Sequence, residues 1–247
     1  MRWMWVLVAM VALSTLASAL AGAAPVGDRL GQVLLAYPAD DGLRRGAAAE
    51  RRWLTGEGCV VTSATTADRA ALRRVIRRLA TTLEDPAFRA LIAQKADWAV
   101  PVGHAADPGD TWVIDTRAGA RALARLDGED GPAVLDVLTY SGRPCLAGEA
   151  TNAYSVPSRA VLLLRRPYLE AQLGRGEYGE RQLAATLLHE VLHDLGFVHP
   201  HPDEGLDAPA YVSSVPVFVS CAARYWPDRD AIDAGCPGAP GAAVARR

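Results

Sequence analysis

The sequence predicts an α+β fold, because helical and strand-like segments both occur along one chain. Residues 64–83 place apolar side chains at helical spacing, which indicates an amphipathic helix. Residues 111–115, 133–140 and 158–164 are short runs with the apolar content of β-strands. Residues 180–195 return to helical spacing, and turn-forming residues separate the strand-like runs. Half of the 247 residues are hydrophobic, which is enough for one domain with a core.

The first 23 residues have the pattern of a secretory signal peptide, which is removed from a mature protein. Arg2 gives a positive start, residues 6–16 form a compact apolar run, and small residues follow as far as Ala23. An uncleaved N-terminal anchor is the alternative interpretation. We therefore expect a secreted protein, extracellular or periplasmic, that does not contact a membrane once this segment has been cleaved.

The rest of the chain is expected to form one catalytic domain over residues 24–236. Residues 25–58 show weak periodicity, so they are interpreted either as an ordered strand and helix or as a propeptide. Residues 237–247 are rich in proline, glycine and alanine, which indicates a disordered tail. The net charge of −2 gives no reason to expect a nucleic-acid partner.

The helix expected over residues 64–83 carries five arginines on the face opposite its apolar side chains. We interpret these arginines as a solvated helix face. The alternative is that they bind an anionic partner. Pro86 begins a second helical stretch that continues to Ala96. Residues 174–179 are interpreted as a glycine-spaced loop that leads into the helix at 180–195.

Four cysteines follow the signal segment: Cys59, Cys145, Cys221 and Cys236. An even number in an exported chain predicts two disulfides, and four cysteines allow three pairings. We favour Cys221–Cys236, because the intervening loop is short and rich in turn residues, and this leaves Cys59–Cys145. A free Cys59 thiol that blocks a metal in a precursor is the alternative. The cysteine spacings do not match a zinc-thiolate site.

The strongest functional signal is a group of histidines around the end of the last long predicted helix. His189 and His193 lie one turn apart on one helix face, so both imidazoles can reach a single metal ion. Glu190 lies about 100° around the helix from His189, where it can act as general base toward a metal-bound water. Gly196 permits a sharp left-handed turn after the helix, which returns His199 to the metal.

Three neutral imidazoles leave a fourth tetrahedral position open, which is the pattern of a catalytic zinc site. A chance cluster on a core helix is the alternative, but the chain has five histidines and four of them lie within thirteen residues. Imidazole ligands at this spacing favour zinc over other divalent ions. Because the imidazoles must be neutral to bind, activity should fall in acid as they are protonated.

Other polar residues near the motif have weaker claims to a role. His201 could replace His199 as the third ligand, but the spacing after the glycine favours His199. A carboxylate could also be the third ligand, and the candidates are Asp203, Glu204 and Asp207. Asp194 either orients a ligand histidine or faces solvent. His104 lies in a segment rich in glycine and proline and is assigned no role.

The eleven residues from His189 to His199 resemble the extended zinc-binding motif of the metzincin clan of metallopeptidases, His-Glu-x-x-His-x-x-Gly-x-x-His. The resemblance implies that Glu190 activates the water that attacks a peptide carbonyl. It also implies zinc ligands at His189, His193 and His199. The implied fold is metzincin-like, with a mixed twisted sheet, an active-site helix and a small C-terminal subdomain. An upstream edge strand would pair with extended substrate, and residues 158–164 are our candidate.

The chain departs from the metzincin pattern after the third histidine. Metzincins place a methionine in a tight turn beneath the metal, whereas the methionines of this chain all lie in the first ten residues. Residues 211–217 are the best positional counterpart, and we expect another apolar residue to pack under the histidines there. Tyr211 is either a tyrosine that touches the metal or the transition state, as in some members, or an ordinary core or surface residue.

The sequence therefore predicts a secreted, monomeric zinc metalloendopeptidase that acts on a protein or peptide substrate. A zinc hydrolase of non-peptide amides or esters would have the same site chemistry and differ only in its cleft. A secreted metal-binding or interaction module without activity is the third possibility. The intact Glu190 argues against that module, because metal binding alone does not require this carboxylate.

Overall fold

The computed structural model describes residues 60–63, 65–102, 111–127, 136–141, 153–156, 161–200 and 209–236, together with Arg52, Thr55 and Gly56. The expectations for the signal segment, the tail and the Cys59–Cys145 pair lie outside the described residues, as does nearly all of the expected propeptide. The remaining candidates outside them are His104, His201, Asp203, Glu204 and Asp207.

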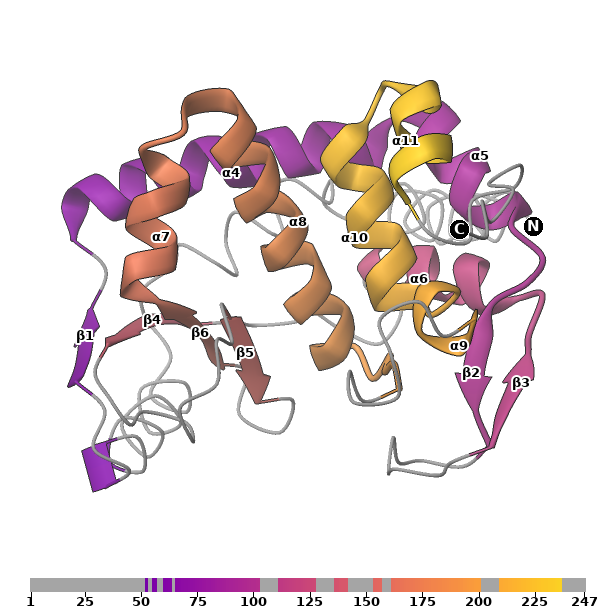
Figure 1. Cartoon of the computed structure of the whole chain (residues 1–247), viewed down its shortest axis with the longest axis horizontal. Helices are drawn as coiled ribbons and strands as arrows, with labels where there is room; N and C mark the ends of the chain where they lie inside the picture. Colours follow the sequence, from indigo (N-terminus) through magenta and orange to yellow (C-terminus); the bar gives the residue numbers. More distant parts are fainter. Residues whose placement is uncertain are drawn as a thin grey trace, which may run out of the picture.

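A mixed four-stranded sheet lies at one end of the molecule (Figure 1). Its strands, in spatial order, are β1 (Val60–Ser63), β4 (Asp136–Ser141), β6 (Val161–Arg165) and β5 (Ala153–Val156). β4 and β6 run parallel, whereas β1 and β5 are antiparallel to their neighbours. The strands predicted around residues 133–140 and 158–164 are present, and the α+β class is confirmed.

The expectation that residues 158–164 form the edge strand is wrong, because β6 is an inner strand. It pairs with β4 on one side and with β5 on the other. Leu162, Leu163 and Leu164 are all completely buried. A strand covered on both faces has a continuous apolar sequence, whereas edge strands are shorter and more polar. Among the described strands, β5 takes the edge next to β6.

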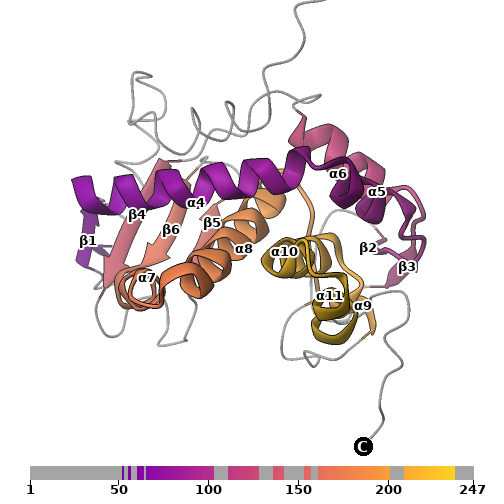
Figure 2. The same ribbon diagram turned by 90° about the horizontal axis from the view of Figure 1, so that it is seen from above.

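Two consecutive helices follow β1, as the sequence predicted. α4 (Thr66–Glu84) runs along the molecule from the sheet toward α5 (Pro86–Gln94), as Figures 1 and 2 both show. A capping box begins α4, because the Thr65 hydroxyl accepts from the Asp68 N–H at 3.1 Å and the Asp68 carboxylate accepts from the Thr65 N–H at 2.8 Å. The Asp85 side chain caps α5 in a similar way.

The central helix is α8 (Gly176–Asp194), which follows α7 (Arg166–Leu173). It begins four residues earlier than predicted, so the expected loop over residues 174–179 is confined to a turn at Gly174 and Arg175, and residues 176–179 are helical. Gly176, with φ of 61°, turns the chain directly into the helix. Apolar side chains at helical spacing bury α8 against its neighbours: Leu183, Ala184, Leu187, Leu188, Val191 and Leu192.

Three short helices form the C-terminal part: α9 (Pro209–Val212), α10 (Val215–Tyr225) and α11 (Arg229–Gly235). α10 packs directly against α8. The predicted Cys221–Cys236 disulfide is confirmed, with a Cα–Cα distance of 5.6 Å, and it ties α10 to the end of α11. α9 and α11 therefore pack against α10, which lies beside the central helix α8.

The end of the molecule opposite the main sheet contains a small antiparallel pair of strands and a helix (Figure 1). The elements are β2 (Ala99–Pro101), β3 (Trp112–Ile114) and α6 (Ala118–Leu126). β3 matches the strand predicted at 111–115. A contiguous hydrophobic core reaches from Leu72 in α4 to Ile232 in α11 and includes α6 and α8. None of the described helices is both long enough and apolar enough to cross a lipid bilayer.

Candidate metal centre

Three histidines meet at the C-terminal end of α8. The Nε2 atom of His189 lies 3.1 Å from Nε2 of His193 and 3.2 Å from Nε2 of His199. His189 and His193 belong to the helix, whereas His199 follows it. Within the described part of the chain, these side chains form the group that could hold a metal ion. The structure thus brings together the three residues that the sequence nominated.

A tight turn after α8 makes this convergence possible. Gly196 has φ of 85°, in the left-handed region that glycine adopts without a steric penalty. Its N–H donates to the His193 carbonyl, and the Phe197 N–H donates to the Leu192 carbonyl, both at 2.9 Å. This pair of hydrogen bonds is the Schellman arrangement that ends a helix and reverses the chain. The reversal brings His199 back over the last helical turns.

Each histidine is oriented by a backbone carbonyl that accepts from its other ring nitrogen. The pairs are His193 Nδ1 with the Phe197 carbonyl at 2.8 Å, His199 Nδ1 with the Pro200 carbonyl at 2.8 Å, and the His189 ring with the Pro216 carbonyl. A carbonyl can only accept, so the bonded ring nitrogen carries the proton. In the neutral ring, Nε2 then keeps its lone pair, and three lone pairs face one another.

Three lone pairs at this separation repel one another, and a positive charge between them would relieve that repulsion. A proton is a poor candidate, because burial, assisted by the charges of the neighbouring histidines, lowers the pKa of His189 to about 3. Burial also lowers the pKa of His193 to about 4, so both rings are neutral at pH 7. The donor set therefore fits a metal cation held by neutral imidazoles.

Glu190 lies in α8 directly after the first histidine of the cluster. Its side chain is only 8% exposed, although carboxylates are seldom buried in proteins. The helix places it beside the metal-binding face but not on it, since consecutive helical residues differ by about 100°. This position suits a group that acts on a bound water and does not bind the metal itself.

The segment predicted to replace the methionine turn lies against the histidines. The Tyr211 ring is edge-on to the His199 ring, with centroids 5.0 Å apart, and burial raises the pKa of the tyrosine hydroxyl. Pro216 supplies the carbonyl that holds His189, and Val215 beside it is 1% exposed. The start of α10 thus lies beside His189 in helical conformation, and the packing of an apolar side chain under the histidines stays a prediction.

Asp194 does not orient a ligand histidine. All three rings use backbone carbonyls for that purpose. One carboxylate oxygen of Asp194 is buried without a hydrogen bond to any described residue, and burial raises the pKa of this group to about 6. Of its two predicted roles, orientation is therefore excluded, and the side chain is partly buried instead of fully solvated.

Sequence reasoning missed the carbonyls of Phe197, Pro200 and Pro216, which fix the imidazole rings. Backbone acceptors leave no mark in residue identity, so a motif search cannot find them. The two prolines lie in the stretch after the motif and are the only sequence trace of these anchors, since proline fixes φ and donates no backbone hydrogen bond.

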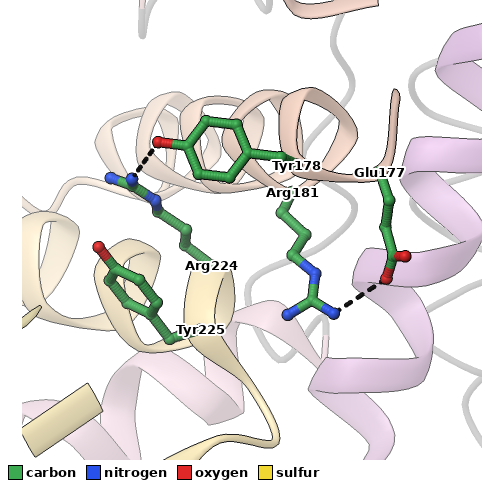
Figure 3. Close-up of a pocket in the computed structure, with 5 residues that line it drawn as sticks. All are labelled: Glu177, Tyr178, Arg181, Arg224 and Tyr225. Carbon is green, nitrogen blue, oxygen red and sulfur yellow. Dashed lines mark hydrogen bonds and ion pairs between the residues drawn. The ribbon is translucent and has the colours of Figure 1, made fainter. Parts of the chain in front are cut away.

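The other end of α8 carries a pocket of ≈ 280 Å³ (Figure 3). Its lining residues are Glu177, Tyr178, Arg181, Arg224 and Tyr225. Arg224 donates to the Tyr178 hydroxyl at 2.9 Å, and Arg181 pairs with Glu177 at 2.9 Å. Eleven residues separate Tyr178 from His189, so this pocket lies roughly 16 Å along the helix from the histidines. The pocket is a separate feature from the histidine cluster.

No protein-family model, curated protein or solved structure matches the chain.

Proposed function

We propose that the protein is a secreted zinc metalloendopeptidase of the metzincin type. The observation that carries the proposal is the convergence of three imidazoles at the end of α8, where His189 Nε2 lies 3.1 Å and 3.2 Å from the Nε2 atoms of His193 and His199. When bound by His189, His193 and His199, zinc supplies a water of lowered pKa and polarises a substrate carbonyl. A site with three protein ligands leaves a position open for that chemistry, unlike a closed structural site.

Backbone carbonyls and one carboxylate of the protein orient the histidines and transfer the proton. The Phe197, Pro200 and Pro216 carbonyls hold the imidazoles as neutral, oriented ligands. Glu190 takes the proton from the attacking water and passes it to the leaving amine, which is general acid–base catalysis by one carboxylate. Its burial excludes competing solvent from this proton transfer.

β5 is the feature that favours a peptide substrate. It is a sheet edge among the described strands, and α8 packs against it. An extended peptide can add to such an edge through main-chain hydrogen bonds, and this brings a scissile carbonyl toward the end of α8. We assign to β5 the substrate-binding role that the sequence had suggested for residues 158–164.

Secretion is part of the same proposal. Disulfides persist in oxidising compartments, and the Cys221–Cys236 bond fits a chain exported by an N-terminal signal. We expect the mature protein to act as a monomer. A zinc hydrolase of non-peptide amides or esters remains the alternative enzyme, because the site chemistry is shared.

The test is a Glu190→Gln variant assayed with casein or gelatin and with small ester substrates. Loss of the general base should lower peptide hydrolysis by roughly 10²–10⁴-fold, while one zinc ion per chain is retained. Glu177→Gln, on the exposed end of the same helix, is the matched control and should keep full activity. Near-normal turnover by Glu190→Gln would remove the assignment, and activity confined to esters would favour the alternative enzyme.

A further inference from the structure

Arg125, in the last turn of α6, reaches across to the end of α8. Its Nη1 atom donates a hydrogen bond of 2.5 Å to the Leu195 carbonyl. Its guanidinium carbon lies 5.3 Å from the centroid of the Phe197 ring. Arg125 therefore contacts the residue before Gly196 and the residue after it, and holds the helix-ending turn from both sides.

The two contacts suit the chemistry of this turn. The last carbonyls of a helix have no partner within the helix, and they carry the negative end of the helix dipole. The Arg125 guanidinium supplies a donor and a positive charge to one of them. A cation over an aromatic face adds further attraction, about 0.5–1 kcal/mol at exposed sites and more where water is excluded. The fit is close, since a Cβ atom on Gly196 would lie 3.2 Å from Arg125 Nη1.

Phe197 connects this contact to the metal centre. Its ring lies under Arg125, and its backbone carbonyl accepts the hydrogen bond from His193 Nδ1 at 2.8 Å. A shift of Phe197 would move that carbonyl and rotate the His193 ring. The same turn begins the path to His199, three residues after Gly196. Two of the three imidazoles therefore depend on the turn that Arg125 holds.

We propose that Arg125 is a positioning residue of the metal centre, which sets zinc affinity by fixing the turn at Leu195–Phe197. This inference rests on the proposed function, because it assumes that the three histidines bind zinc. Arginine is suited to the role, since a planar guanidinium stacks on an aromatic ring while its N–H groups bond a carbonyl. Lysine can replace the charge and one hydrogen bond but not the planar stacking.

The experiment compares zinc affinity in wild type, Arg125→Ala and Arg125→Lys, by competition with a chromophoric chelator. The matched control is Arg121→Ala, one turn earlier on α6, where Arg121 pairs with Asp115 at 2.6 Å and is 48% exposed. Loss of a group that orients a ligand typically weakens metal binding about 10–100-fold. We expect that loss in Arg125→Ala, a smaller one in Arg125→Lys, and wild-type affinity in Arg121→Ala.

Two further measurements separate positioning from general stabilisation. Thermal unfolding of each metal-free variant reports whether the fold is intact, and the visible spectrum of bound Co²⁺ reports the ligand geometry. We expect an altered Co²⁺ spectrum in folded Arg125→Ala. A lower unfolding temperature with unchanged zinc affinity and spectrum would overturn the inference. If Arg125→Ala does not fold, Arg125→Lys decides, and wild-type affinity in that variant also overturns it. Wild-type protein that binds no zinc would instead contradict the proposed function.

Discussion

The two ends of α8 differ in their exposure to solvent and in the groups that hold their side chains. At the N-terminal end, Glu177 and Tyr178 are 65% and 54% exposed, and side chains such as Arg78 and Arg181 make the contacts there. At the C-terminal end, the histidines are partly or largely removed from solvent, and backbone carbonyls hold their rings. A flexible side-chain partner tolerates movement, whereas a backbone anchor does not. Backbone anchors are therefore found at the end of α8 where the three histidines meet.

The side chains at the two ends of α8 also differ in charge. Hydrogen bonds from Arg78 and Arg181 lower the pKa of the Glu177 carboxyl to about 2, so it stays charged in water. Burial lowers the pKa of His189 to about 3, so it stays neutral in the interior. One end therefore presents ions to solvent, and the other presents uncharged nitrogen donors to a cation.

The largest effect on zinc affinity is expected from a substitution at the C-terminal end of α8. His193→Ala removes one of three nitrogen donors, so zinc affinity should fall by more than the roughly 100-fold typical of losing a supporting group. Tyr178→Phe, at the exposed end, should leave affinity unchanged. Chelator competition measures both variants. Equal affinities in His193→Ala and wild type would mean that the histidine cluster is not the metal centre.

A smaller effect is expected from substitution of Gly176, the first residue of α8, and of Gly196, two residues after its end. Gly176 and Gly196 both have positive φ, so alanine should destabilise the fold at either position by about 1–2 kcal/mol. The surroundings differ, since a Cβ at Gly176 meets open space and a Cβ at Gly196 meets Arg125. Gly196→Ala should therefore also weaken zinc binding, whereas Gly176→Ala should not. Urea unfolding and zinc titration test this, and equal zinc affinities in the two variants would contradict it.

The smallest effect concerns the exposed carboxylate. The folded-state pKa of Glu177 is about 2, below its ordinary value of 4.5, so its pairing with arginine stabilises the fold above about pH 4.5. That contribution is lost as the pH falls from 4.5 toward 2. Glu177→Gln should flatten the dependence of the unfolding temperature on pH across this window and leave zinc binding unaltered. An unchanged pH profile in the variant would show that these exposed pairs contribute nothing measurable.

The sequence predicted the histidine cluster better than it predicted the sheet, and the reason is the number of residues that separate the interacting groups along the chain. His189, His193 and Gly196 act through local helix and turn geometry, so their spacing alone carries the information. Which strand lies at the edge of the sheet depends on which strands pair. The sequence of β6 does not indicate that β5 will pair with it. Arg125 is 70 residues from its partner Leu195, and nothing in its local sequence distinguishes it from Arg121, the other arginine of α6.

The central claim is tested most directly by the metal content of the protein purified at neutral pH, beside that of His199→Ala. The arrangement of the three Nε2 atoms predicts one zinc ion per wild-type chain and loss of tightly bound zinc from the variant. Wild-type protein that takes up no zinc, or a variant that holds a full equivalent as tightly as wild type, would contradict the account.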